Sequence, residues 1–500
     1  MLEGLLSLTP VLLTLIVAVW SRNVVFGLFS GVFLGVLLLH GPNPFTATAY
    51  MVEHYLVAQA AKPANAGILI LMIFISGLVG LMEKSGGARA FAAMMIRYVN
   101  SKTKASLGAW VSGCLLFFTD SGTPLIVGPL FRPIMDGLKV SRAKLAWIVD
   151  STASPVAVLI PFIGWGLYSQ GLIGEEYAGL GITESPFLSY VKAVPYQFYP
   201  VLAVFMVPLF VLTRTDFGPM RTAEINAEHG IVAGDQPEEE ISDETLAQRE
   251  KARPVLVWLP LLIMLGVMFG LLIPQGFPMD ISHLSSNAFR SSLSAGYIFA
   301  AITLMVLMAH SGIASLARGF SSYLESMSRI VPVLAILVLA WSLGAIGKDL
   351  GAPKFIASLV GNNVPVFLIP LSAFIVGGLI SFATGSSWGT YAILFPLTIP
   401  LAHQLGLPMP LVIGAVLSGG LFGDHCSPIS DTTILSATGA GCSQLEHVKT
   451  QIPYALLNGG ICVFAFLLAG LTGNMLGLFV GTALLVAIVI ALKLKRQRGE

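Results

Sequence analysis

The sequence predicts an all-α polytopic membrane protein with about eleven transmembrane helices, arranged as two inverted five-helix repeats. Three observations lead to this class. The chain is 55% hydrophobic and 11% charged, whereas a soluble globular protein is about 25% charged. Apolar runs of roughly 17–25 residues, the length needed to cross the hydrocarbon layer as a helix, recur along the chain. Two polar breaks within such runs also recur at a fixed spacing.

The balance of charge and the cysteine pattern exclude several other classes of protein. The 27 Lys and Arg residues nearly cancel the 26 Asp and Glu residues, so no large basic surface remains for nucleic acid. The four cysteines lack CxxC spacing and the density of a disulfide scaffold, so we expect neither disulfides nor zinc. The phosphate-binding pattern GxxxxGK[ST] does not occur. We therefore expect no ATP drive and no cofactor other than coupling ions.

The first half of the chain, residues 1–213, and the second half, residues 254–473, are each predicted to carry five spans. The predicted spans are residues 5–21, 23–39, 66–83, 143–165, 190–213, 255–273, 288–309, 330–347, 408–435 and 450–472. Residues 474–500 are expected to add a C-terminal helix and a basic tail. Glu3 stands where a signal peptide would carry basic residues, so we retain the first run as a span.

Residues 214–253 form the only long polar segment of the sequence and include the acidic run 238–240. We interpret this segment as a cytosolic linker between the two halves. A solvated connector is favoured over a regulatory element.

Two further apolar stretches, residues 104–136 and 365–402, are interrupted by polar tips at 119–124 and 384–387. Non-helical backbone at membrane depth is tolerated only where protein or a water-filled cavity satisfies its polar groups. We therefore interpret each stretch as a re-entrant hairpin whose tip lines an internal site. The alternative is an ordinary pair of short spans with the polar loop outside the membrane.

The two halves are related by an internal repeat. Several residues recur at an offset of 264, as in Gly344 and Gly80 (344 − 80 = 264), and the same offset relates Thr384 to Asp120. The stretch that begins at Asp150 resembles the stretch that begins at Asp424, and a proline interrupts each of these predicted broken helices, 143–165 and 408–435. Because five crossings is an odd number, the second copy is expected to lie upside down, as in many secondary transporters.

The distribution of charges predicts the orientation, because Lys and Arg accumulate in short cytoplasmic loops. Basic residues gather between spans on one predicted side and in the C-terminal tail, whereas loops 166–189 and 274–287 fall on the other side, and loop 166–189 is acidic. We expect the N-terminus outside, the C-terminus in the cytoplasm, and a location in a bacterial inner membrane.

Four aspartates lie inside the predicted membrane segments, where ionisable groups are costly and usually functional: Asp120, Asp150, Asp424 and Asp431. Hydroxyl side chains gather at the same breaks. The candidate hydroxyls are Ser121, Thr123, Ser154, Thr384, Ser386, Ser387, Ser427 and Thr432. The alternatives are that Asp424 or Asp431 caps a half-helix, and that Asp150 is a structural partner of its broken helix.

These groups suit the binding of a small cation. Na+ requires several oxygen ligands, which carbonyls, hydroxyls and one carboxylate can supply, and we assign Na+ to Asp120 and Asp424. Burial favours the neutral form of a carboxyl group and a bound cation favours its ionised form, so Na+ and H+ compete for one site. The N-termini of half-helices at the tips could instead hold the carboxylate of an organic anion or an amino acid.

His425 and the tryptophans are interpreted as structural. His425 adjoins Cys426, but neighbouring residues on a helix point apart, so a metal site is not predicted. Trp165 and Trp388 are expected to serve as packing or interfacial anchors. Trp388 is the exception worth testing, because it lies at the second tip.

The segments Gly423–Ile434 and Ser381–Thr390 resemble the NhaC-type Na+/H+ antiporter family. The resemblance implies the ion transporter superfamily fold, with two inverted repeats and re-entrant hairpins, and a homodimer. It also implies that the signature residues Asp424, Ser427, Asp431, Thr432, Thr384, Ser386 and Ser387 bind ion or substrate.

The predicted function is therefore that of a secondary Na+/H+ antiporter. The same family includes exchangers of hydroxy acids and carriers of amino acids, so Na+- or H+-coupled transport of a small organic solute is the alternative. An intramembrane protease with two aspartates and a passive channel are less favoured, and we expect no enzymatic activity.

Overall fold

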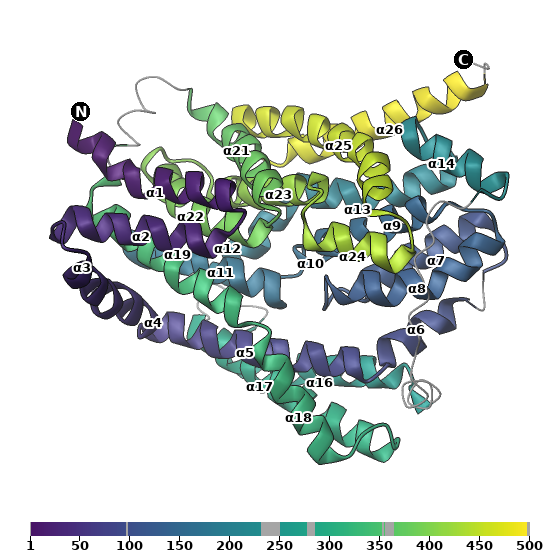
Figure 1. The fold of residues 1–500 in the computed structure, drawn as a ribbon, viewed down its shortest axis with the longest axis horizontal. Coiled ribbons are helices and arrows are strands. Elements are labelled where there is room, and N and C mark those ends of the chain that lie inside the picture. Colours follow the sequence, from purple (N-terminus) through teal and green to yellow (C-terminus); the bar gives the residue numbers. More distant parts are fainter. Residues whose placement is uncertain are drawn as a thin grey trace.

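The structure is a computed structural model that describes residues 2–96, 99–231, 251–277, 286–352, 355 and 365–497. All regular structure in these ranges is helical (Figure 1). Among them, eight helices are long and apolar enough to cross a membrane, or up to ten if each of two bent pairs counts as one span. The prediction of an all-helical, multi-span membrane protein is confirmed. The count is lower than about eleven because the apolar part of the first helix and the arms of the first broken span are short.

The helices of the first half begin and end as follows. They are α1 (Leu2–Ser21), α2 (Val24–His40), α3 (Pro44–Tyr50), η1 (Met51–Val57), α4 (Ala58–Ala60), α5 (Pro63–Lys84), α6 (Gly87–Ile96), α7 (Lys102–Leu115), α8 (Gly122–Gly137), α9 (Arg142–Ser151), α10 (Ser154–Ala157), α11 (Gly164–Leu180), α12 (Pro186–Ala193), η2 (Val194–Tyr196) and α13 (Phe198–Thr213).

The second half has a similar order of elements. Its helices are α16 (Val255–Leu272), η3 (Ile273–Gln275), α17 (Ser286–His310), α18 (Leu316–Ser328), α19 (Val331–Asp349), η5 (Val366–Leu368), α21 (Ile369–Thr384), α22 (Ser387–Gln404), α23 (Met409–Cys426), α24 (Asp431–Ala440), α25 (Gln444–Thr472) and α26 (Leu476–Gln497).

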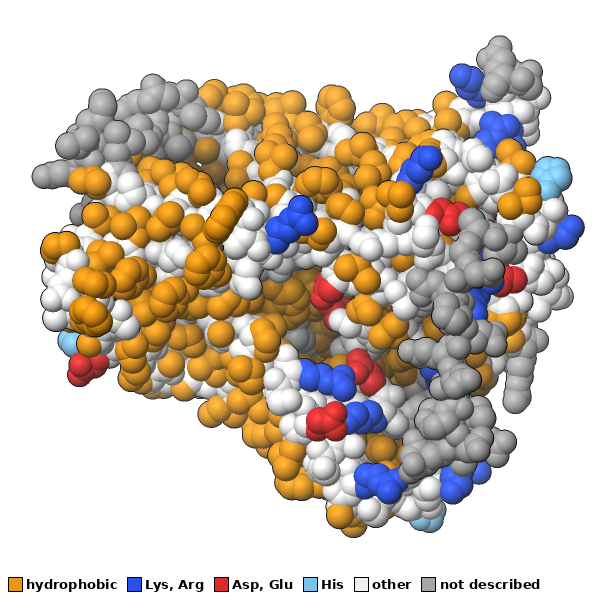
Figure 2. All heavy atoms as spheres, viewed as in Figure 1, with side chains coloured by type: hydrophobic (Ala, Val, Ile, Leu, Met, Phe, Trp, Pro, Cys, Tyr) orange, Lys and Arg blue, Asp and Glu red, His pale blue; other side chains and the backbone are white. Residues whose placement is uncertain are grey.

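Hydrophobic side chains dominate the left and upper parts of the face seen in Figure 2, as expected for a protein whose solvent is lipid. Many large apolar side chains on the long helices are exposed, among them Leu262 on α16, Phe464 on α25 and Phe479 on α26. In water such a surface would aggregate. In a bilayer it makes favourable contact with acyl chains, so these helices are apolar around most of their circumference.

The two predicted hairpins are pairs of helices packed against each other. The stretch 104–136 contains α7 and α8, and the stretch 365–402 contains η5, α21 and α22. Gly385 ends α21 in the left-handed conformation, with φ of +66°. A Cβ at this residue would also lie 2.8 Å from the carbonyl oxygen of Ile429. Only glycine therefore fits this second tip.

Both predicted broken spans are interrupted, but the first extends beyond its predicted end. Within 143–165, α9 ends at Ser151 and α10 is a single turn, and the second arm is α11, which runs to Leu180. Residues 166–189 are therefore helical over most of their length, and the prediction that they form an outer loop is wrong. The acidic side chains Glu175 and Glu176 suggested a loop, but they are buried and paired with Lys62 (2.6 Å) and Lys348 (3.1 Å). Within 408–435, α23 ends at Cys426 and α24 begins at Asp431.

The first part of the expected linker 214–253 is folded onto the rest of the protein. It contains α14 (Gly218–Glu228), which packs on α9 and α25. Its Glu224 accepts a hydrogen bond from the backbone N–H of Ser141 (2.8 Å) and lies 3.5 Å from Lys144 Nζ. The rest of the linker, residues 232–250, lies outside the described residues, as does most of the predicted loop 274–287.

The two halves interlock by reciprocal contacts. Helix α2 packs on α19 and α17 packs on α5, while α11 packs on α22 and α24 packs on α8. One end of α5 is tied to the start of α19, because Arg329 lies 3.3 Å from Glu83. The opposite ends of α5 and α19 contact neighbouring acids of α11 through Lys62 and Lys348. Helices α5 and α19 therefore run in opposite directions.

The contact between α8 and α24 leaves no room for side chains at its glycines. A Cβ added at Gly439 would lie 2.2 Å from the carbonyl oxygen of Pro124, and one at Gly128 would lie 2.5 Å from the carbonyl carbon of Gly439. Small residues allow such close backbone approach between helices in membranes. This contact joins the first hairpin to the second broken span.

We predict that Gly439→Ala destabilises the protein by about 1–3 kcal/mol, because the added methyl group forces the two helices apart. The measurement is the unfolding midpoint of the purified protein in detergent. Gly460→Ala on α25 is the matched control, because a Cβ there meets no atom within 4 Å, and alanine is the better helix former. Equal midpoints for the two variants would contradict the assigned contact.

Candidate functional site

The first tip holds Asp120 between α7 and α8. Its Oδ1 accepts hydrogen bonds from the backbone N–H of Ser121 (2.7 Å) and from Ser121 Oγ (3.2 Å). Its Oδ2 accepts a hydrogen bond from Trp165 Nε1 at the start of α11 (2.7 Å). Thr123 Oγ1 donates to the carbonyl oxygens of Thr119 (2.7 Å) and Leu116 (3.2 Å), which stabilises the turn. The carboxylate is thereby fixed beside the N-terminus of α8, where negative charge is favourable.

Asp120 lines a cavity of about 470 Å³ between α5, α8, α11 and the start of α19. The cavity is also lined by Glu83, Arg329, Trp165 and Trp388. Figure 2 shows a hollow near the centre of the visible face, edged by acidic and basic side chains. No sequence signal marks Glu83 or Arg329 as site residues, because both lie at helix ends, where charged residues are ordinary.

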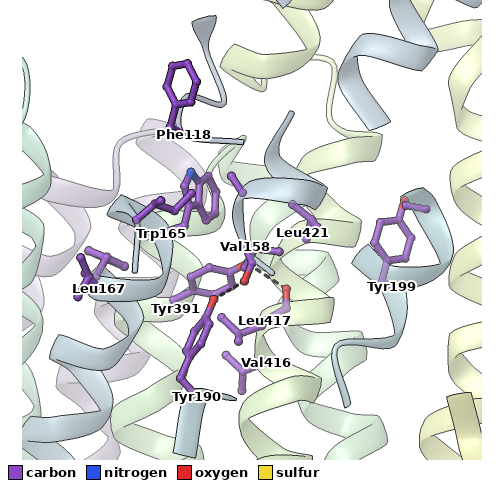
Figure 3. Close-up of a cluster of buried hydrophobic side chains, with 14 of the residues drawn as sticks. Phe118, Val158, Trp165, Leu167, Tyr190, Tyr199, Tyr391, Val416, Leu417 and Leu421 are labelled. Atoms are coloured by element: carbon purple, nitrogen blue, oxygen red, sulfur yellow. Dashed lines mark hydrogen bonds between the residues drawn. The ribbon is translucent and has the colours of Figure 1, made fainter. Parts of the chain in front are cut away.

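Two tryptophans connect the first tip to the second. The rings of Trp165 and Trp388 are 4.6 Å apart, and Tyr168 Oη donates to the carbonyl oxygen of Trp388 (2.6 Å). Tyr391 on α22 also contacts Trp165, with ring centroids 6.1 Å apart, and Figure 3 shows Trp165 between Phe118 above it and Tyr391 below it. Trp165 thus does more than the packing that was expected of it, because it hydrogen-bonds the candidate carboxylate.

The hydroxyl groups of the second tip form hydrogen bonds with backbone groups of the protein. Ser386 Oγ accepts a hydrogen bond from the backbone N–H of Gly389 (3.3 Å) and caps α22. Ser387 Oγ donates to the carbonyl oxygen of Gly420 (3.2 Å), and Thr384 Oγ1 donates to that of Ile380 (2.8 Å). These bonds stabilise the break that the sequence predicted.

Ser427 joins the second tip to the second broken span. Its Oγ donates to the carbonyl oxygen of Phe382 (2.8 Å) and accepts a hydrogen bond from the backbone N–H of Ile429 (3.4 Å). Thr432 Oγ1 lies 3.1 Å from Ser430 Oγ. The two segments that resemble the family, Gly423–Ile434 and Ser381–Thr390, therefore lie next to each other in space.

Asp424 and Asp431 occupy opposite ends of this break. Asp424 is buried in the last turn of α23, and Asp431 lies in the first turn of α24, where its Oδ1 accepts from the backbone N–H of Thr432 (2.9 Å). The N-cap of α24 is Ser430, so the capping interpretation of Asp424 is wrong. A carboxylate at a helix C-terminus opposes the helix dipole, which makes a purely stabilising role for Asp424 unfavourable.

The structure brings Asp424 and Asp431 within range of electrostatic repulsion from Asp150 and Asp120. Repulsion among like charges is relieved by a bound cation or a proton. Among the described residues, no group of three or more His, Cys, Asp or Glu side chains is placed to hold a metal ion. A cation here would need neutral oxygen ligands from hydroxyls and carbonyls beside one carboxylate.

Asp150 lies in the last turn of α9, next to the end of α23. Its Oδ2 accepts a hydrogen bond from Gln451 Nε2 (2.5 Å), and His447 Nε2 lies 3.3 Å away. His425 Nε2 is 3.7 Å from the same oxygen. The hydroxyl of Ser154, beside this break, is buried without a hydrogen-bond partner in the described part of the chain. His447 and Gln451 carry no sequence signal, because they meet Asp150 only through the packing of α25 on α9.

Two buried tyrosines hydrogen-bond backbone carbonyl groups (Figure 3). Tyr190 Oη donates to the carbonyl oxygen of Val158, which follows α10. Because interrupted helices leave carbonyl groups without helical partners, a side-chain donor of this kind stabilises the break at membrane depth. Tyr391 Oη donates to the carbonyl oxygen of Leu417 within α23 (2.9 Å), which joins α22 to α23.

A helical membrane protein with carboxylates held at interrupted helices has the construction of a secondary transporter. Residues 156–471 match the Na+/H+ antiporter family, and the chain belongs to this family, as its signature segments predicted. It is therefore a transporter and not an enzyme.

Two proteins are similar to this chain in sequence, and one solved structure is similar to it in fold. A protein of Haemophilus influenzae, described only as uncharacterized, is 31% identical over 97% of this chain and 95% of its own. A malate-2H(+)/Na(+)-lactate antiporter of Bacillus subtilis is 35% identical over 28% of each chain. The crystal structure of the YdaH transporter of Alcanivorax borkumensis has the same fold, with a TM-score of 0.55 and 16% identity over 85% of this chain and 88% of that one.

We predict an energetic coupling between Trp165 and Asp120, because Trp165→Phe removes a hydrogen bond to a carboxylate and keeps the ring. Such bonds contribute about 1.5–3 kcal/mol. The measurement is a double-mutant cycle of unfolding free energies with Trp165→Phe and Asp120→Asn. Trp110→Phe is the matched control, since Trp110 Nε1 donates to the backbone carbonyl oxygen of Val204 and not to Asp120. A coupling energy near zero would remove Trp165 from the site.

Proposed function

We propose that the protein exchanges Na+ for H+ by alternating access, with Na+ bound at Asp120 and Asp424. One observation carries the proposal. Asp424 is buried, and among the described residues it has no Lys or Arg partner. An uncompensated buried charge is strongly unfavourable, so this carboxyl group requires either a proton or a cation. The two ions would therefore compete for the group.

The helix ends around the site support binding of a cation. Asp424 lies in the last turn of α23, and a helix C-terminus carries partial negative charge that attracts cations. Asp431 and Asp120 add negative charge from the facing elements. Ser427, Ser430 and Thr432 bring hydroxyl oxygens to the same break. We assign five further predicted site residues, Ser121, Thr123, Thr384, Ser386 and Ser387, to holding the two tips in position.

We further propose that the halves are inverted repeats with re-entrant hairpins, and that the broken spans move relative to the tips. The reciprocal packing and the opposite directions of α5 and α19 support this arrangement. Gly113 on α7 approaches Thr152 closely, and its counterpart Gly377 on α21 approaches Gly420, so each hairpin meets a broken span through a glycine. Placing the N-terminus outside and the C-terminus in the cytoplasm agrees with their positions at opposite ends of the molecule (Figure 1).

We predict that an imposed Na+ gradient drives H+ flux in proteoliposomes, and that Asp424→Asn and Asp120→Asn each reduce this flux about a hundredfold or more. Loss of one charged partner of a buried ion costs about 3–5 kcal/mol. The apparent affinity for Na+ should weaken as the pH falls, because H+ competes for the carboxylates. The measurement uses a pH-sensitive dye inside the vesicles.

Glu53→Gln is the control for the loss of one carboxylate, because Glu53 is exposed on η1. It should transport as the wild type does. Wild-type flux in the two site variants would disprove the assigned ligands, and absence of Na+-driven H+ flux in the wild type would disprove the exchange itself.

The size of the cavity supports a second candidate, the coupled transport of a small organic solute. A volume of about 470 Å³ far exceeds what a single ion needs, since a water molecule occupies about 30 Å³ in the liquid. Arg329 supplies a cationic group and the two tryptophans supply apolar faces. A partial relative named as a malate-2H(+)/Na(+)-lactate antiporter supports a hydroxycarboxylate, and an amino acid would also fit the mixed charges.

We predict that, if such a solute is carried, hydroxycarboxylates or amino acids raise the unfolding temperature only when Na+ is present. Arg329→Gln should weaken the effect of anionic solutes about tenfold or more, because a hydrogen bond to a charged group contributes about 1.5–3 kcal/mol. Arg253→Gln is the control, since Arg253 is exposed and does not line the cavity. If no hydroxycarboxylate or amino acid raises the unfolding temperature, solute transport is contradicted and Na+/H+ exchange remains the proposed function.

A further inference from the structure

A second cavity lies at the end of the molecule that carries the C-terminal helix. It has a volume of about 490 Å³ and is lined by residues of α7, α9, α13, α14 and the last turn of α26. Figure 1 shows α7, α14 and the end of α26 at the right-hand end of the view. The cavity is lined by five basic and three acidic side chains: Lys102, Lys144, Arg214, Arg221, Arg496, Asp216, Glu224 and Glu228. Its wall therefore carries an excess of positive charge.

The three acids of this cavity are paired with its two lysines. Lys144 Nζ lies 2.7 Å from Asp216 Oδ2 and 3.5 Å from Glu224 Oε2. Lys102 Nζ lies 2.8 Å from Glu228 Oε1. The carboxylates of the wall are thereby compensated without any contribution from the arginines.

The three arginines of the cavity keep most of their donors available. In the part of the chain that the structure describes, Arg214, Arg221 and Arg496 form no ion pair with a carboxylate. Arg214 Nη2 lies 3.4 Å from Thr103 Oγ1, and Arg496 Nη1 donates to the carbonyl oxygen of Arg214. A guanidinium group has five N–H donors in a planar fork that matches the oxygens of a phosphate group. The cavity therefore suits a phosphate-bearing anion.

The N-terminus of α7 adds further donors to the same cavity. Ser101, the N-cap of this 14-residue helix, and the first-turn residues Lys102 and Thr103 line the wall. The first amide groups of a helix lack helical partners, and the helix dipole favours negative charge beside them. The helix terminus and the three arginines thus favour the same kind of ligand.

The cavity adjoins surface that is suited to contact with acyl chains. Helices α13 and α26 pack against each other, and their last turns expose Leu212 and Leu494, which are 63% and 50% exposed. Ile225, which is 44% exposed, lies in the cavity wall itself. A phospholipid can use both the basic cavity and this apolar surface, whereas a free phosphate ion gains nothing from the apolar side chains.

We propose that this cavity binds the headgroup of an anionic phospholipid, with the phosphate held by Arg214, Arg221 and Arg496 and the acyl chains along α13 and α26. Basic pockets between membrane helices on the cytoplasmic side are known to bind anionic headgroups. The orientation proposed above places this end of the molecule there. The site shares no lining residue with the cavity at Asp120, so the inference does not depend on which ion or solute is transported.

The test measures lipid binding to the purified full-length protein in detergent by native mass spectrometry. Phosphatidylglycerol is compared with phosphatidylcholine that has the same acyl chains. We expect phosphatidylglycerol to bind about tenfold or more tightly, because a hydrogen bond to a charged group alone contributes about that factor. It should also raise the unfolding temperature, since a ligand of the folded state stabilises it, and inorganic phosphate at the same concentration should not. Equal affinity for the two lipids, or equal stabilisation by inorganic phosphate, would overturn the proposal.

The double variant Arg221→Gln, Arg496→Gln should weaken the binding of phosphatidylglycerol about tenfold or more. The matched control is Lys493→Gln, Lys495→Gln, which removes the same charge from exposed positions on α26 that do not line the cavity. Equal loss in both double variants would show adsorption by general charge and would contradict a specific site.

A single variant keeps the test valid if the double variant does not fold. Arg221 is exposed, and its side chain forms no hydrogen bond or ion pair with the described residues. Arg221→Gln should therefore fold as the wild type does and still weaken the binding of phosphatidylglycerol. Unchanged affinity in this variant would remove Arg221 from the site and overturn the proposed arrangement.

Discussion

The rest of the structure depends on the cost of leaving polar backbone or charge unsatisfied inside a membrane. A transporter needs interrupted helices to present ligands at membrane depth, and each interruption leaves amide and carbonyl groups without helical partners. Here hydroxyl side chains satisfy many of those groups. Thr123 closes the first tip, Ser427 joins the second tip to the second broken span, and Tyr190 donates to the carbonyl oxygen of Val158 after α10. The site residues and the structural residues are therefore interleaved.

The buried and half-buried acids fall into two groups with different physical roles. Glu175, Glu176 and Glu83 pair with Lys62, Lys348 and Arg329, and these pairs join the ends of α5, α11 and α19. Asp150 and Asp424 have no such partner among the described residues and lie in the last turns of their helices. The first group stabilises one arrangement of the helices. The second group gains a compensating charge only from a proton or another bound ion, which agrees with the transport function proposed above.

Two predictions from the sequence were wrong for different reasons. Glu175 and Glu176 suggested a loop because their partners, Lys62 and Lys348, lie more than 100 residues away in the chain. Asp424 could be interpreted as a helix cap because it stands close to Pro428, but α24 begins only at Asp431, with Ser430 as its N-cap. The first error came from contacts between segments distant in sequence, and the second from the residue at which a helix begins.

The sequence by itself determined the class of the protein, most of its spans, the positions of its breaks and the family to which it belongs. These features depend on composition, on the length of apolar runs and on local Gly, Pro and hydroxyl residues, which act over a few neighbouring positions. Only the tertiary structure decided which charges are paired, that Trp165 holds Asp120, and that Asp150 meets His447 and Gln451. Such interactions need two helices to lie at a particular distance and rotation, and no local pattern encodes that geometry.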